Sequence, residues 1–136
     1  MNTLTFLKLY ALSFGSLLAL DSLWLVKIAP KLYKSNIGHL MADKTNFLAA
    51  GLFYIIYIFG VVFFVVQPAF EKSSVSYALV RGAVFGLVAY ATFDLTSNAV
   101  FKNWPAKITI IDMFWGTILT SGVASLATFL AIKLFK

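Results

Sequence analysis

The chain has 136 residues, of which 61% are hydrophobic and only 12% are charged, and its mean hydropathy is +0.90. Soluble domains are roughly 45 to 50% apolar and about 25% charged, so this composition excludes a soluble globular domain and predicts an integral membrane protein. The absence of cysteine excludes disulfides, thiolate metal sites and a cysteine nucleophile. The formal net charge of +6 comes mostly from basic residues beside the apolar runs, which is typical of loops at anionic lipid surfaces and does not indicate nucleic-acid binding.

Four apolar runs follow one another along the chain, and each is long enough to cross about 30 Å of hydrocarbon as a helix. They cover approximately residues 4–28, 46–66, 75–100 and 108–134. Helices are the only uninterrupted structure that satisfies the backbone in lipid. We therefore expect an all-α, polytopic membrane protein whose single domain, residues 1–136, is a four-helix transmembrane bundle with both termini on one side.

The first run begins like a signal peptide, because Lys8 precedes the apolar stretch 11–20. The hydrophobic residues continue through residues 21–26 without a small-x-small cleavage motif, so we interpret this run as a membrane span. The basic residues are divided almost equally between the two sets of loops. The positive-inside rule therefore leaves both orientations open.

Three of the five acidic residues lie inside the predicted spans. Asp21 lies seven residues before the end of the first span and Asp94 six before the end of the third, so both are roughly 10 Å below the same surface. Asp112 lies four residues into the fourth span, which starts from that surface. We therefore expect the three carboxyl groups to meet in a common recess beneath one face of the membrane.

Other polar and aromatic residues gather at the same depth. A tryptophan follows Asp21 and Asp112 by three residues, Tyr90 precedes Asp94 by four and an asparagine follows it by four, so each lies near its acid on a helix face. Small residues at four-residue steps on the third and fourth spans allow close helix approach, so the acid-bearing faces are expected to contact protein. The candidate ligand-binding or proton-binding residues are Asp21, Trp24, His39, Tyr90, Asp94, Asn98, Asp112 and Trp115.

Each acid also has a structural interpretation. Thr109 and Asp112 form a T-x-x-D pattern at a predicted helix start, close to a capping box, where the helix dipole stabilises a carboxylate. Asp21 and Asp94 lie in the C-terminal parts of their helices, where the dipole and the low dielectric both penalise the anion. A structural role for them requires partners, either lysines folded down from the loops or a shared proton. Otherwise, an acid within a membrane span indicates a functional site.

Several chemistries are excluded or disfavoured. The chain has no Gly-rich phosphate loop after a strand and no H-E-x-x-H motif, and a single histidine excludes haem with two histidine ligands. Paired acids on adjacent turns, as used in many membrane metal sites, are missing, and no nucleophile has an adjacent base. We therefore predict no metal and no cofactor, and we assign no catalytic residue.

A series of short motifs resembles a known family over nearly the whole chain. They are D-x-x-W (residues 21–24), L-Y-x-x-x-I-G (32–38), F-D-L-T-x-N-A (93–99), a lone loop tryptophan (Trp104) and D-M-x-W-G (112–116). The pattern is similar to a family of small bacterial predicted membrane proteins catalogued as a domain of unknown function. This resemblance implies a four-helix, multi-pass protein of the cell inner membrane and supplies no activity.

Three functional hypotheses remain open. The first is a protein that binds or carries a small cationic or amphipathic ligand, or exchanges a proton with it, through the acids of the first and third spans. The second is a lipid-active isomerase or cyclase, in which a neutral carboxylic acid donates a proton and tryptophan faces stabilise a developing cation. The third is a structural or accessory subunit. We favour the first because carriers tolerate sparse chemistry, and small-residue faces leave a homo-oligomer open as well.

Overall fold

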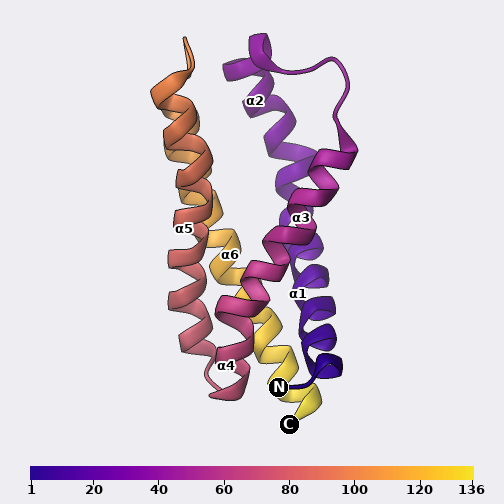
Figure 1. Cartoon of the computed structure of the whole chain (residues 1–136). Helices are drawn as coiled ribbons and strands as arrows, with labels where there is room; N and C mark the ends of the chain where they lie inside the picture. The colour runs from indigo at the N-terminus through magenta and orange to yellow at the C-terminus, as the bar shows by residue number, and fades with distance from the viewer.

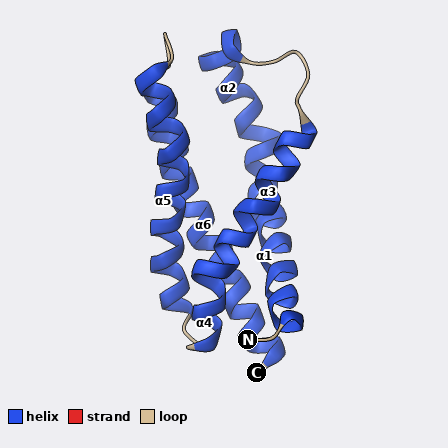
Figure 2. Cartoon of the chain, viewed as in Figure 1, coloured by secondary structure: helices blue, strands red, loops and turns tan.

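The computed structural model describes the whole chain, residues 1–136, and it is built from helices alone, without a strand (Figure 2). Four of the helical segments are long and apolar enough to cross a membrane. The predicted all-α, four-helix architecture is therefore confirmed. Both termini lie at one end of the bundle, here called the terminal end, and the opposite end is called the loop end (Figure 1).

The first two long helices are each assembled from several pieces. The first comprises α1 (Thr3–Leu23), the π-helical turn η1 (Trp24–Ile28), α2 (Ala29–Ile37) and the 3-10 turn η2 (Gly38–Leu40). The second comprises α3 (Phe47–Val61), the π-helical turn η3 (Val62–Val66) and α4 (Gln67–Glu71), and it is followed by α5 (Val75–Val100) and α6 (Ala106–Phe135). The first helix thus continues well beyond Ile28, where the apolar run ends.

Both π-helical turns end two residues before a proline. In an α-helix the proline ring would collide with the carbonyl four residues earlier, and its missing N–H would leave that carbonyl without a partner. The wider turn relieves this conflict, because the N–H of Ala29 donates to the carbonyl of Trp24 before Pro30. Gln67 donates to Val62 in the same way before Pro68. The first helix bends at η1, and α2 leaves the axis of α1 (Figure 1).

Side-chain caps begin three of the helices but not α6. Asn2 accepts a hydrogen bond from the Thr5 amide at 2.8 Å, and Asn46 and Ser74 make the same bond at 3.1 Å for α3 and α5. α6 begins after Pro105 without a side-chain cap. The capping-box interpretation of Thr109 and Asp112 is therefore wrong, because both residues lie beyond the first helical residues, with their side chains turned to other helices.

α5 and α6 run side by side along their length and meet through small residues (Figure 1). A Cβ atom added to Gly86 would collide with the carbonyl oxygen of Gly116 and lie 2.7 Å from the Thr120 side chain. A Cβ atom on Gly82 would lie 3.0 Å from backbone atoms of residues 120 and 121. This contact agrees with the four-residue spacing of small residues, which predicts close helix approach.

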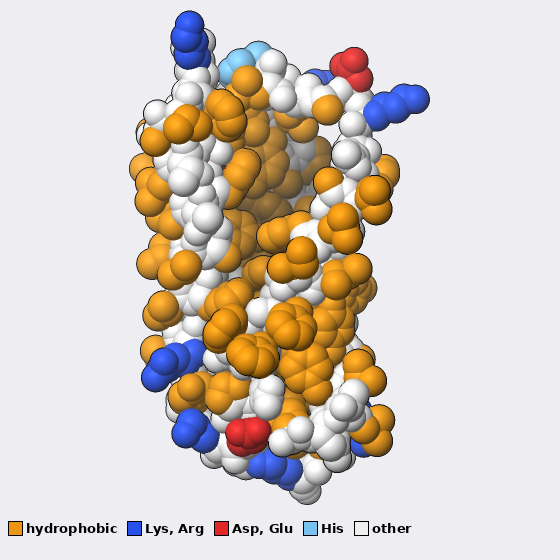
Figure 3. All heavy atoms as spheres, in the orientation of Figure 1, with side chains coloured by type: hydrophobic (Ala, Val, Ile, Leu, Met, Phe, Trp, Pro, Cys, Tyr) orange, Lys and Arg blue, Asp and Glu red, His pale blue; other side chains and the backbone are white.

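The apolar core lies toward the terminal end, where the second half of the α3–α4 helix packs between the other helices. Val61 and Val62 are fully buried, whereas Phe47 and Leu48 at the start of α3 are 80% and 75% exposed. α3 therefore diverges from α5 toward the loop end. The space-filling view shows a hollow between the two helices on that side (Figure 3).

The α5–α6 contact makes a stability prediction. Gly86→Ala should lower the free energy of unfolding by about 1–3 kcal/mol, because the new methyl group collides with Gly116 and Thr120. Gly51→Ala is the matched control, since nothing lies within 4 Å of a Cβ atom there. Thermal unfolding in detergent should show a lower midpoint for Gly86→Ala only. Equal midpoints for the two variants would contradict the proposed contact.

Candidate ligand-binding site

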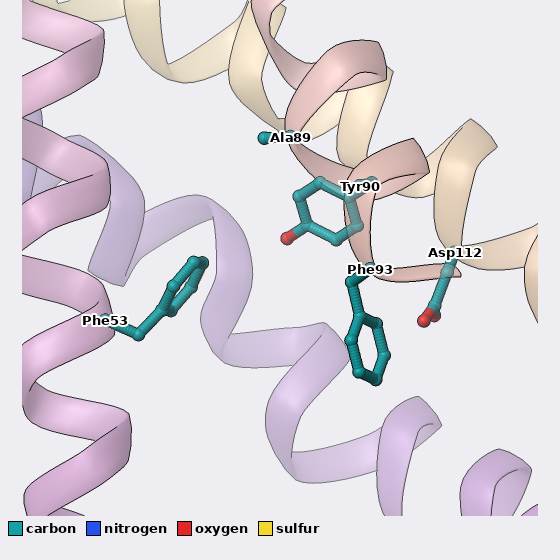
Figure 4. Close-up of a pocket in the computed structure, with 5 residues that line it drawn as sticks. All are labelled: Phe53, Ala89, Tyr90, Phe93 and Asp112. Carbon is teal, nitrogen blue, oxygen red and sulfur yellow. The ribbon is translucent and has the colours of Figure 1, made fainter. Parts of the chain in front are cut away.

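A cavity of about 360 Å³ opens between α3, α5 and α6 toward the loop end. Its lining residues are Phe53, Ala89, Tyr90, Phe93 and Asp112. The close-up shows the rings of Phe53 and Phe93 extending into the space between α3 and α5, with the Asp112 carboxyl group approaching from α6 (Figure 4). The cavity is therefore an apolar, largely aromatic chamber with one acid in its wall.

Asp112 is buried, with only 5% of its surface exposed, and it accepts a hydrogen bond from the hydroxyl group of Tyr33. Tyr33 belongs to α2, which η1 tilts away from the axis of α1. Its ring also packs edge-on against Trp24, with 6.4 Å between the ring centroids. The bond from Tyr33 thus connects α2 to the acid in the cavity wall.

Asp94 is fully buried, and Asp112 is a neighbouring acidic group. Neither of its carboxyl oxygens has a hydrogen-bond donor. Only its backbone carbonyl is paired, by the Thr109 hydroxyl at 3.2 Å, and Thr109 in turn accepts from the Trp104 indole at 2.9 Å. Two ionised carboxylates are both acceptors, so this pair forms a hydrogen bond only when a proton lies between them.

Asp21 lies in a different recess. It accepts a hydrogen bond from the Trp115 indole at 3.3 Å, and Trp115 stacks on Trp24 with 4.8 Å between ring centroids. The recess beside Asp21 is about 70 Å³, formed mainly by α1 with Tyr54 from α3. The structure therefore brings Asp94 and Asp112 together but separates Asp21 from them, because the indole of Trp115 occupies the position next to it.

The other predicted residues divide between the chamber and the surface. Tyr90 lines the cavity, with its ring packed over Gly116. Asn98 is exposed, whereas Ser97 is buried, so the buried face of α5 runs from Asp94 through Ser97 and the predicted place of Asn98 beside Asp94 in the site is wrong. His39 is exposed in η2. Neither Asn98 nor His39 lines the cavity.

Sequence reasoning missed Tyr33, which bonds to Asp112, and the two phenylalanines that line the cavity. Tyr33 lies in a segment interpreted as a loop, although its L-Y-x-x-x-I-G motif provided a signal. Phe53 and Phe93 look like ordinary lipid-facing residues of their spans, and nothing in their spacing distinguishes them. Aromatic residues that line a cavity between membrane helices can be identified only once the helices are positioned.

The acids have no basic partners. The side-chain hydrogen-bond donors to Asp21 and Asp112 are an indole and a phenol, and Asp94 has none. The lysines considered as counter-ions for Asp21 and Asp94 therefore do not pair with them. No group of three histidine or acidic side chains lies close enough to hold a metal ion.

The family model described as Predicted membrane protein (DUF2177) matches residues 6–130, and the chain belongs to this family of membrane proteins of unknown function. The resemblance inferred from the motifs is therefore confirmed. No curated protein and no solved structure matches the chain.

The Trp115 indole is predicted to stabilise the buried Asp21 carboxyl group. Trp115→Phe preserves an aromatic ring next to Trp24 but removes the donor, so it should lower the free energy of unfolding by about 1–3 kcal/mol. The same substitution in an Asp21→Leu background, which has no acceptor, should cost less, giving a coupling of about 0.5 kcal/mol or more in a double-mutant cycle of unfolding in detergent. Purely additive effects would argue against the bond.

Proposed function

We propose that this member of a membrane-protein family binds or carries a small cationic amphipathic molecule, with its apolar part in the chamber and its charged end at Asp112. The observation that supports this most directly is the chamber itself, which combines four apolar lining residues with one buried acid. Its volume of about 360 Å³ is within the roughly 300–1,000 Å³ of small-molecule sites. An apolar chamber with one charged group matches a ligand with an apolar body and one polar end.

The charge of the site supports a singly charged cation. Asp94 and Asp112 are both buried, where two carboxylate charges would be costly, and a proton shared between them would supply the donor that Asp94 lacks. The pair then has one negative charge. With no basic side chain bonded to either acid, the remaining charge is available to a ligand cation.

Two features favour binding or transport over the other hypotheses. Trp24 and Trp115 each cover one face of the other, which leaves less ring surface for stabilising the cation of an isomerase or cyclase reaction. A purely structural polar network needs no cavity beside it, whereas Asp112 lies in the wall of a cavity of about 360 Å³. The tyrosine of α2 adds a contact that a ligand cation could displace at Asp112. We propose the cell inner membrane as the location of this role, which the resemblance to a family of bacterial membrane proteins supports.

The role of Asp112 is tested with decylamine, which is cationic at neutral pH. Decylamine should bind saturably to the protein in maltoside micelles, and Asp112→Asn should weaken this binding by about tenfold or more, since a charge pair is lost. Asp43→Asn, in the exposed loop, is the control and should bind as the unmodified chain does. Equilibrium dialysis of radiolabelled decylamine measures the affinity of both variants. Unchanged binding by Asp112→Asn would contradict the proposal.

The location of the ligand is tested by filling the chamber. Ala89→Phe places a ring where the cavity is open and should reduce binding of the same probe by about tenfold or more, because the ligand volume is occupied. Ala99→Phe on the same helix is exposed and lies outside the cavity, so it should have no effect. Equal affinities of the two variants would place the ligand elsewhere.

A further inference from the structure

We infer that the cation bound in the chamber is a quaternary ammonium group, surrounded by the rings of Phe53, Tyr90 and Phe93 and balanced by the Asp112 carboxylate. This inference rests on the proposed function and adds the chemical class of the ligand. It follows from which side chains line the chamber and from the hydrogen bonds that the chamber can and cannot make.

Three of the five lining residues are aromatic, and they come from two helices that face each other across the cavity. Figure 4 shows Phe53 extending from α3 toward the α5 side, where Tyr90 and Phe93 lie. The face of an aromatic ring is electronegative and attracts a cation positioned over it. Rings on opposite walls with an acid nearby form the arrangement that recognises methylated ammonium groups.

The supply of acceptors argues against a primary ammonium group. Such a group has three N–H donors, and each one left unpaired in a buried site costs free energy. Among the lining side chains only Asp112 and the Tyr90 hydroxyl offer acceptors, and one oxygen of Asp112 already accepts from Tyr33. A quaternary ammonium group has no N–H to satisfy, so the aromatic walls suit it better.

The ring walls are held in place by further aromatic residues. Phe53 stacks on Tyr57 with 5.5 Å between centroids, and Tyr57 is buried and hydrogen-bonded to Thr120 of α6. Phe93 packs edge-on against Trp104 at 5.7 Å, and Trp104 donates to Thr109. Rings that are positioned before binding lose less conformational entropy when a ligand binds, as expected for a preorganised site.

The test compares decyltrimethylammonium with decylamine, which share one chain length and one charge. In maltoside micelles the quaternary compound should bind about tenfold more tightly. Phe53→Leu, which keeps an apolar wall but removes the ring, should weaken binding of the quaternary compound by about five- to tenfold and change decylamine binding by less than about twofold. Phe93→Leu provides the same comparison from α5 if the first variant does not fold.

Phe63→Leu is the matched control, because Phe63 belongs to the same long helix, is 51% exposed against 50% for Phe53, and does not line the chamber. It should leave both affinities unchanged. Equal or tighter binding of decylamine would overturn the quaternary inference while leaving the proposed function intact. A similar loss for both ligands in Phe53→Leu, or the same loss in Phe63→Leu, would also overturn it. Binding of neither cation, or binding insensitive to Asp112→Asn, would instead refute the proposed function.

Discussion

The close approach of α5 and α6 is the contact on which the candidate site depends. Gly86 lies against the backbone of Gly116, so no side chain separates the two helices at this level. Asp94 is two turns farther along α5 and Asp112 about one turn before Gly116 on α6, both toward the loop end. Because the helices are antiparallel and nearly touching, the two acids are brought together. Larger residues at the glycines would separate the helices and, with them, the carboxyl groups.

The chamber exists because this tight pair is combined with a helix that diverges from it. The α3–α4 helix is buried only in its second half, where valines fill the core, and its first half is exposed to the surroundings. The core at the terminal end therefore holds the bundle together while the loop end stays open. The packed core and the open cavity are thus located at opposite ends of one small protein.

The sequence was sufficient for the fold and for part of the site. Apolar runs long enough to cross a membrane predict four helices, and four-residue spacing predicts the Gly82 and Gly86 contact with α6. Depth along the spans also indicates that Asp94 and Asp112 lie at one level. Depth contains no information on rotation about the bundle, however, so it did not show that Trp115 occupies the space beside Asp21. Hydropathy likewise ended the first span at Ile28, whereas backbone hydrogen bonding extends the helix through the polar residues beyond it.

The π-helical turn η1 sets the direction of everything that follows it in the first helix. Such a turn inserts one residue relative to an α-helix, and one residue corresponds to about 100° of rotation. Tyr33, which bonds to Asp112, lies beyond this turn, so its direction includes the offset between α1 and α2. The direction in which the tyrosine points around the helix axis thus depends on the length of a single turn, five to nine residues earlier in the chain. Shortening that turn by one residue would leave the sequence of α2 unchanged but would turn each of its side chains toward a different neighbour.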